Sequence, residues 1–232
     1  MLTAFALLSL AATLALGRWQ LSRAAQKEAW QNSITAQGAL PPLAGMALAA
    51  RGASLSDLHR RVNLRGYWMS ASTVFLDNRQ MHNQPGWYVV TPLRIEGSET
   101  VVLVQRGWVA RNFMDRTSLP QLQTPAGSVE IRGRIAAPPS KLYEFSGANT
   151  GRIRQNLDMA AFGVELGRPL LPVSVQQTGV ASEGLQRDWP VFETGVDKHY
   201  GYAFQWFALG SLIAILYIWF QIVRRFIYSR RT

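Results

Sequence analysis

The sequence predicts an α+β membrane protein in which two transmembrane helices flank one mainly antiparallel β domain. This domain is folded as a sheet or a small barrel and lies outside the cytoplasm. Three observations lead to this fold class. An uncharged run lies near each end of the 232-residue chain, short β-rich segments fill the middle, and the net charge of +10 is unevenly spread. The ends carry six arginines and no acidic residue, whereas the middle holds the other 18 basic and all 14 acidic side chains.

The C-terminal apolar run, residues 200–223, has 24 residues without a charge. As a helix it would be roughly 36 Å long, enough to cross a hydrocarbon core of about 30 Å. Aromatic residues stand near both of its ends, where the two membrane interfaces would lie. We therefore expect a transmembrane helix over residues 200–223, followed by a basic cytoplasmic tail over residues 224–232.

The N-terminal apolar run, residues 1–21, is interrupted only by Arg18. Two interpretations stay open: an uncleaved transmembrane helix, or a signal peptide cut near residues 15–17, where the small-x-small pattern is imperfect. No basic segment precedes the run. This favours the uncleaved helix, and it also suggests that Met1 is not the natural start.

Two spans would place both termini on one side of the membrane. The arginines after the second span indicate the cytoplasm, so the central domain, residues 22–199, is expected in the periplasm. Arg18, Arg23 and Lys27 follow the first span and oppose this orientation. They carry less weight, because long domains cross the membrane largely regardless of charge.

The central domain begins with a helix over residues 21–36, which continues the first span and is ended by Gly38, Pro41 and Pro42. Beyond it, β-forming residues alternate or cluster between turn signals. Strands are predicted for residues 61–68, 73–76, 87–93, 100–109, 129–135, 152–154 and 172–177.

Three local features connect these strands. Residues 83–86 predict a turn, in which Gly86 adopts a backbone conformation that other residues do not readily adopt. The segments 87–93 and 100–109 are expected to form a hairpin. Residues 158–163 predict a short helix with Asp158 as its cap.

Several kinds of chemistry are not indicated by the sequence. The chain has no cysteine, and no two of its three histidines are spaced as metal ligands on one helix. No nucleophile elbow is present. The 18 basic residues of the middle form no cluster along the chain, so a nucleic-acid partner is not expected. They are best interpreted as a solvated or headgroup-facing surface.

Several segments together resemble the surfeit locus protein 1 family, in its bacterial form. The resemblance runs from about residue 17 to residue 225, with the motifs in the family's order between two spans. Residues that depart from the usual family pattern are Gln105, Ala110 and the pair Trp87-Tyr88. The matching segments are Gly17-Arg18-Trp19-Gln20-Leu21, Arg61–Tyr67, Pro85–Leu93, Val102–Val109, Gln155–Asp158 with Arg187–Pro190, and Lys198–Phe207.

The resemblance implies a role in the assembly of haem–copper cytochrome c oxidase, at the stage where haem A enters the catalytic subunit. It implies a non-enzymatic protein of the bacterial inner membrane that holds haem A transiently. The implied partners are the lipid bilayer, the catalytic subunit of a haem–copper terminal oxidase and the machinery that makes haem A. Two alternatives stay open: a pure protein–protein chaperone without haem contact, and a membrane-anchored enzyme.

His199, at the outer edge of the second span, matches the family histidine that is proposed to contact haem. A neutral imidazole is a ligand for haem iron. Tyr202, Ala203 and Trp206 share its helix face, where Ala203 would leave room and Trp206 would pack on a macrocycle. The predicted cofactor-binding residues are therefore His199, Tyr202 and Trp206. The alternative is an interfacial histidine in an aromatic belt that binds no ligand.

Two further expectations concern packing. Arg106, followed by Gly107, either pairs with a haem propionate or is a satisfied arginine at a strand end, and we favour the structural role. The two spans are expected to pack through small residues, which allow helices to approach closely: Ala12, Gly17, Ala208 and Gly210.

Overall fold

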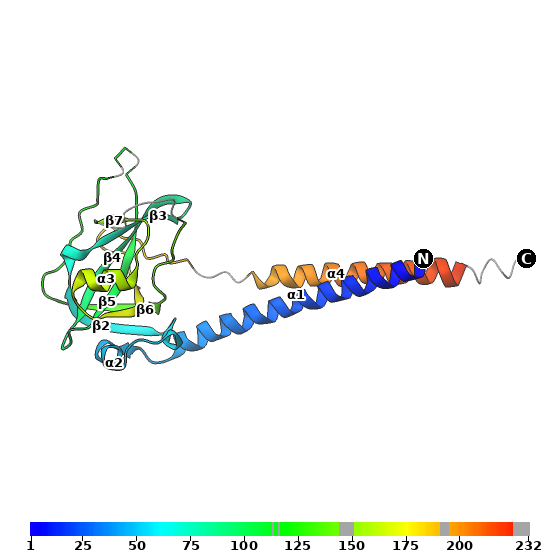
Figure 1. Cartoon of the computed structure of the whole chain (residues 1–232), viewed down its shortest axis with the longest axis horizontal. Coiled ribbons are helices and arrows are strands. Elements are labelled where there is room, and N and C mark those ends of the chain that lie inside the picture. The colour runs from blue at the N-terminus through cyan, green and yellow to red at the C-terminus, as the bar shows by residue number, and fades with distance from the viewer. Residues whose placement is uncertain (113, 116, 144–150, 191–194, 225–232) are drawn as a thin grey trace, which may run out of the picture. The chain divides into compact units, whose positions relative to one another are not determined.

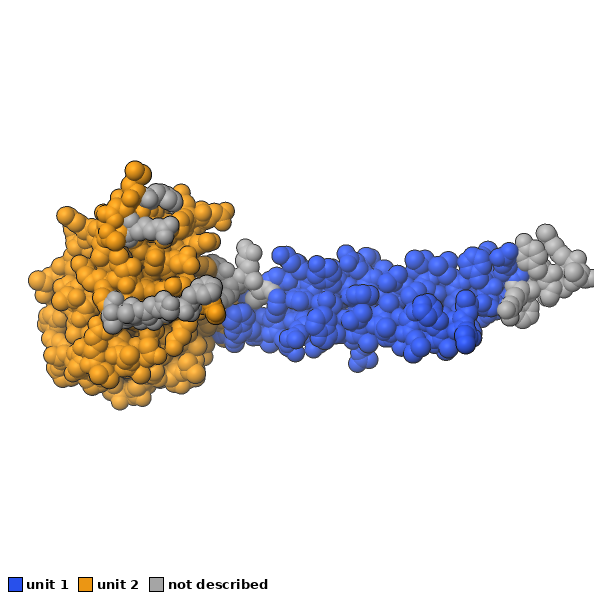
Figure 2. Space-filling model, turned by 45° about the horizontal axis from the view of Figure 1, so that its top comes forward, with its two compact units in different colours: residues 1–33, 192–232 blue, residues 34–191 orange. Residues whose placement is uncertain are grey.

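The computed structural model describes residues 1–112, 114–115, 117–143, 151–190 and 195–224. It divides into two compact units, which Figure 2 shows in different colours. Residues 34–191 form the β unit, and residues 1–33 together with residues 192–232 form the helix unit. The predicted α+β membrane architecture is confirmed, since a mixed sheet lies in the sequence between two long apolar helices. Of the predicted tail, only Arg224 lies within the described residues.

The helix unit is built from α1 (Leu2–Ala39) and α4 (Val196–Ile218), which continues as the π-helical turn η3 (Trp219–Val223). Both helices are long and apolar enough to cross a membrane. Phe5 and Phe204 are 72% and 74% exposed, as expected of side chains that meet lipid rather than a protein core. α1 continues past residue 36 and ends before Pro41 and Pro42, so the predicted helical extension is confirmed.

The β unit follows the order shown in Figure 1. Its described elements are β1 (Leu43–Ala44), α2 (Gly45–Arg51), η1 (Leu55–Asp57), β2 (Arg61–Trp68), η2 (Ser70–Ser72), β3 (Val74–Met81), β4 (Gln84–Ile95), β5 (Val101–Ala110), β6 (Ser128–Ala136), β7 (Ile153–Arg154), α3 (Met159–Leu166) and β8 (Leu170–Gln177). Each predicted strand corresponds to an observed one, and the predicted hairpin is the β4–β5 pair.

The strands form a closed ring. β2 pairs with β6, β6 with β8, β8 with β5 and β5 with β4, and the end of β4 pairs back with the end of β2. The β5–β8 pair is parallel, whereas the other pairs of the ring are antiparallel. β3 extends the sheet from the first half of β4, and β7 pairs in parallel with β3. Of the two predicted forms, sheet or small barrel, the structure therefore has the barrel.

Alternate residues of every ring strand point inward, as the two-residue period of a strand requires. Leu43 from β1 and Leu48 from α2 join the same core. The inward residues of the ring are Val62, Leu64, Leu93, Ile95, Val102, Val104, Ile131, Ile135, Leu171, Val173 and Val175. The core of the β unit is thus the barrel interior.

A second layer covers part of the barrel's outer surface. Phe162 of α3 packs with Val90 of β4 and Leu103 of β5, and Figure 1 shows α3 lying over these strands. The predicted cap of α3 is confirmed, because the Asp158 carboxylate accepts hydrogen bonds from the amides of Ala160 and Ala161 at 3.0 Å. These amides and Lys141 hold the pKa of Asp158 below its usual range.

The predicted turn at residues 83–86 is wrong in position. The chain reverses at His82 and Asn83, which have φ values of 50° and 60°, the conformation of a two-residue type I′ hairpin loop. Gly86 lies inside β4 and does not have a positive φ. A methyl group on Gly86 would collide with the Trp108 ring and the Val109 carbonyl, so close packing explains this glycine.

Ring closure can be tested at Gly66, which pairs with Ile95 of β4 on one side and with Val129 of β6 on the other. A methyl group there would overlap the Arg94 carbonyl oxygen, a backbone atom that cannot move without opening the β2–β4 seam. We expect Gly66→Ala to lower the free energy of unfolding by about 2–3 kcal/mol. Gly127→Ala, which has open space around it, should cost far less. Equal thermal unfolding midpoints for the two variants would contradict a closed ring.

Candidate functional site

The helix unit is an antiparallel helix pair. The Tyr217 hydroxyl donates to Thr3 Oγ1 at 3.1 Å, so the start of α1 lies beside the end of α4. Towards the middle, Gly210 approaches Thr13, and a methyl group on Gly17 would lie 2.7 Å from the Phe207 ring. The start of α1 and the end of α4 are therefore at one end of the pair, and His199 is at the other.

The predicted small-residue packing is half right. Gly17 and Gly210 are buried at the helix contact, whereas Ala12 and Ala208 are exposed. In place of the two alanines, the buried residues that join Gly17 and Gly210 are Thr13, Ala24 and Ala203. Glycine at the crossing allows close approach, and the remaining small residues continue the same face.

The His199 side chain lies against Gln20 of α1. Its Nδ1 is 2.7 Å from Gln20 Oε1. An amide oxygen can only accept, so Nδ1 carries the proton and Nε2 keeps its lone pair. Among the residues that the structure describes, Nε2 has no hydrogen-bond partner. The histidine is thus held in one tautomer with one nitrogen available as a ligand.

The neighbours of His199 differ in exposure. Ala203 is 2% exposed and is packed into the helix pair, while Tyr202 is 52% exposed and projects from it. Trp206 is half-buried. The Tyr200 hydroxyl, from the residue next to His199, donates to Glu28 Oε1 at 2.9 Å. Of the predicted residues, His199 and Ala203 therefore face α1, whereas Tyr202 projects from the pair.

Gln20 was missed as a site residue. It belongs to the segment Gly17–Leu21, which was recognised only as a family motif. The available signal was spacing: Gly17 and Gln20 are three residues apart and share one helix face, so a glycine that faces α4 also turns the glutamine towards it.

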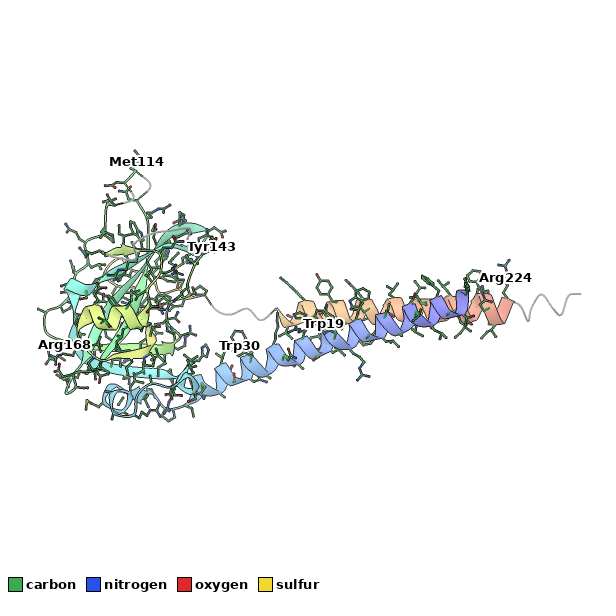
Figure 3. All side chains as sticks on the ribbon, in the orientation of Figure 1. Trp19, Trp30, Met114, Tyr143, Arg168 and Arg224 are labelled. Carbon is green, nitrogen blue, oxygen red and sulfur yellow. The ribbon has the colours of Figure 1, made fainter. Side chains whose placement is uncertain are left out.

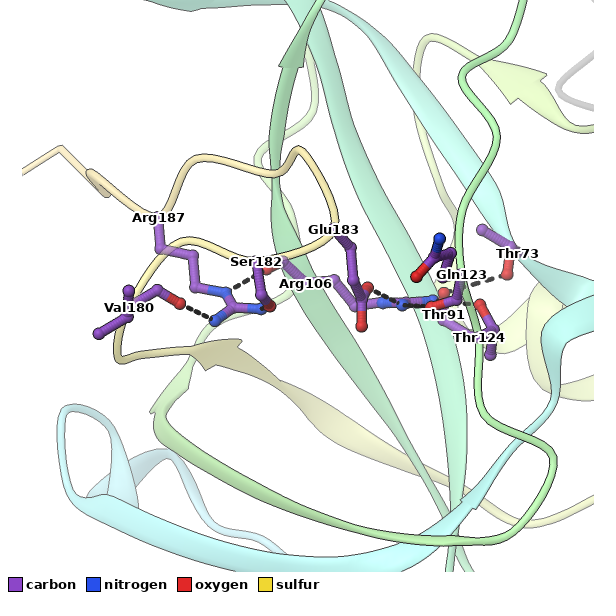
Figure 4. Close-up of polar contacts among 9 residues, drawn as sticks. All are labelled: Thr73, Thr91, Arg106, Gln123, Thr124, Val180, Ser182, Glu183 and Arg187. Atoms are coloured by element: carbon purple, nitrogen blue, oxygen red, sulfur yellow. Dashed lines mark hydrogen bonds and ion pairs between the residues drawn. The ribbon is translucent and has the colours of Figure 1, made fainter.

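Arg106 is a structural residue, as favoured. Its side chain is 1% exposed and forms an ion pair with Glu183, as Figure 4 shows. Its guanidinium also donates to Thr124 Oγ1 at 2.8 Å and lies 4.8 Å from the Trp68 ring. The expectation of a strand end is wrong, because Arg106 and Gly107 lie inside β5. With these partners, Arg106 is not available to a propionate.

A second group of arginines comes together in the β unit. Arg61, Arg132, Arg134 and Arg187 line a cavity of about 750 Å³ with Asp188 as the acidic member of the lining. This cluster could not be predicted from the sequence, because the four residues are spread over more than a hundred positions. Pairing of β2 with β6 brings Arg61, Arg132 and Arg134 together, and hydrogen bonds from Arg187 to the Arg106 and Val180 carbonyls place the fourth arginine.

These features define a class: a membrane-anchored protein with two apolar helices, a small closed β-barrel between them in sequence, and a histidine oriented by a glutamine at the helix contact. The chain belongs to the SURF1 family, whose model matches residues 7–211. The matched range includes both Gln20 and His199.

A curated relative supports the same assignment. The chain is 26% identical to a SURF1-like protein of Drosophila melanogaster over 247 aligned positions. The alignment covers 95% of this chain and 77% of the relative. The similarity therefore includes the helices and the barrel together.

The structural role of Arg106 predicts a large loss of stability on substitution. Arg106→Leu leaves the Glu183 carboxylate without its partner, which should cost about 3–5 kcal/mol in the free energy of unfolding. The double variant Arg106→Leu/Glu183→Leu should recover part of that loss. As a control, Arg168→Gln removes a largely exposed ion pair with Glu99 and should cost at most about 1 kcal/mol. Denaturant unfolding followed by tryptophan fluorescence measures all three, and equal costs for Arg106→Leu and Arg168→Gln would refute the structural role.

Proposed function

We propose that this protein is a non-enzymatic assembly factor for haem–copper cytochrome c oxidase, and that it holds haem A for delivery to the catalytic subunit. The family membership supports the role in oxidase assembly. One observation carries the haem contact: the hydrogen bond from His199 Nδ1 to Gln20, which leaves Nε2 free to bind iron.

The local geometry fits a transiently held haem. A ligating imidazole is normally oriented by a hydrogen bond from its other nitrogen, which fixes the tautomer and raises ligand basicity. Gln20 supplies that bond here. The exposed ring of Tyr202 and the half-buried ring of Trp206 offer apolar contact for a macrocycle. A single protein ligand on an open helix surface suits cargo that must be released.

The cellular setting is part of the same proposal. The protein is a bacterial inner-membrane protein with both termini in the cytoplasm and the β unit in the periplasm. The antiparallel helix pair supports a common side for the termini, and the basic residue Arg224 after α4 supports the cytoplasm as that side. The proposed partners are the oxidase catalytic subunit, the enzymes that make haem A and the bilayer.

Haem retention by the full-length protein tests the His199 site. When the protein is purified from cells that make haem A, His199→Ala should remove the bound haem, because the iron loses its ligand. Gln20→Leu should weaken retention about 10-fold or more by releasing the imidazole, and Gln20→Glu, which keeps an acceptor, should preserve most of it. Haem per protein is read from the pyridine haemochrome spectrum.

The matched control is Tyr217→Phe, which removes a hydrogen bond at the far end of the same helix pair. It should leave haem retention unchanged. If wild type and His199→Ala carry equal haem, the haem contact is wrong. If neither carries haem, yet both restore oxidase activity and haem A content in a deletion strain, the protein–protein chaperone replaces this proposal.

Orientation in the membrane can be measured cleanly, because the natural sequence has no cysteine. In spheroplasts, Val180→Cys, at a position 88% exposed in the β unit, should react with a membrane-impermeant maleimide. Arg224→Cys should react only after the membrane is permeabilised. The opposite labelling pattern would invert the proposed topology.

A further inference from the structure

The arginine-lined cavity of the β unit is a site of unusual charge. It is bounded by the outer faces of β2 and β6, the end of α1 and the segment after β8, and its volume of about 750 Å³ lies in the range of small-molecule sites. Arg61, Arg132, Arg134 and Arg187 line it, and Asp188 is the carboxylate of the lining. Asp188 itself lies 3.2 Å from His82 Nε2.

Strand register sets like charges opposite one another here. Arg61 of β2 pairs directly with Arg134 of β6, and Asn63 pairs with Arg132. Like charges at directly opposed positions destabilise a sheet. Farther along the same two strands the charges are complementary, since Arg65 faces Glu130 and also forms an ion pair with Glu96 at 3.0 Å. The repulsive arrangement is therefore confined to the cavity.

The four arginines differ in how many of their guanidinium N–H donors already have a partner within the protein. Arg187 donates to the carbonyls of Arg106 and Val180 and to Ser182, so it contributes mainly its charge. Arg134 donates through one nitrogen to Gln176 Oε1 at 2.8 Å. In the part of the chain that the structure describes, the guanidinium groups of Arg61 and Arg132 have no hydrogen-bond or ion-pair partner. Both are exposed residues that line the cavity, and free guanidinium donors match the oxygens of carboxylates and phosphates.

Burial makes this charge costly. Burial lowers the pKa of the Arg134 guanidinium. It also lowers the pKa of Arg187, while Glu183 raises that pKa and Arg106 lowers it further. Burial and then Arg134 lower the pKa of His59 on the cavity wall, which favours the neutral form of that side chain. Both arginines stay protonated at neutral pH. A bound anion would offset the desolvation and the repulsion together.

Apolar groups complete the lining. Ile34 of α1 and Pro42 line the cavity, and Trp189 is held there by a hydrogen bond from its Nε1 to the Gln177 carbonyl at 2.7 Å. The Trp189 ring also packs edge-to-face on Tyr88. The cavity thus combines a fixed apolar wall with convergent cationic donors.

We propose that this cavity binds a small organic anion that carries at least two carboxylate or phosphate groups on an apolar body. Arg61 and Arg132 supply the direct contacts, and Arg134 and Arg187 supply the surrounding positive field. The inference does not depend on the proposed haem contact at His199, because it rests on residues of the β unit alone.

The test titrates the full-length protein in a nonionic detergent with three probes by calorimetry at low salt. Inorganic pyrophosphate represents phosphate chemistry, naphthalene-2,6-dicarboxylate represents carboxylates on an apolar body, and naphthalene-2-methanol is the uncharged control. We expect saturable 1:1 binding of at least one anion, weakened by added salt, and no binding of the alcohol. The anion that binds identifies which of the two chemistries the site prefers. Failure of both anions to saturate at millimolar concentration would overturn the proposal.

Variants on one strand separate binding from folding. Arg61→Gln and the double variant Arg61→Gln/Arg132→Gln should weaken anion binding at least 10-fold, without lowering the Tm of the unliganded protein, because Arg61→Gln relieves repulsion with Arg134. Arg65→Gln, on the same strand and face, should keep wild-type affinity although it loses its ion pair with Glu96. If Arg65→Gln and Arg61→Gln weaken anion binding equally, the binding depends only on the overall surface charge, and the proposed site is refuted.

Discussion

The return of β4 to β2 is the constraint on which the β unit depends. β4 is the longest strand, and one of its edges is divided: its first half pairs with β3, and its last residues pair with Gly66–Trp68 of β2. A strand with side chains at every position could not make this seam, because the side chain at Gly66 would occupy the space of the Arg94 carbonyl. With the seam closed, the ring has no free edge between β2 and β4, and alternate residues of each strand form one dry interior.

Because the barrel interior is small and filled by apolar side chains, its polar contacts lie on the outer surface of the barrel. Arg106 shows how that surface is organised. It is buried beneath two segments without regular structure, where it bonds to Gln123 and Thr124 from one segment and to Glu183 from the other. Arg187 then donates to the Arg106 carbonyl at 3.0 Å. Figure 4 shows these contacts in one line across β5, so a single buried cation joins loops that are far apart in sequence.

Local features of the fold followed from sequence, whereas features that depend on pairing between distant segments did not. Strand positions, the Asp158 cap and the end of α1 before Pro41 could be predicted because period, capping and proline act over a few residues. The His82–Asn83 turn was missed because proline and glycine two residues later gave a stronger turn signal. At the candidate site, His199 was found through a family motif, but its partner Gln20 is 179 residues away in sequence. Parallel pairing of β5 with β8 and the Arg61–Arg134 register likewise have no local signature.

The polar contact between His199 and Gln20 raises the question of why these two side chains face each other between two long, largely apolar helices. In Figure 3, large side chains project along the length of α1 and α4. A polar contact made only to join the helices would be strongest if both partners used all their donors and acceptors, since unsatisfied polar groups are costly next to lipid. This pair uses one atom of each side chain and leaves His199 Nε2 without a partner among the described residues. Close packing at Gly17 and Gly210 already brings the helices together. An imidazole that is oriented but incompletely satisfied therefore supports the proposed ligand contact at Nε2 over a role in helix association alone.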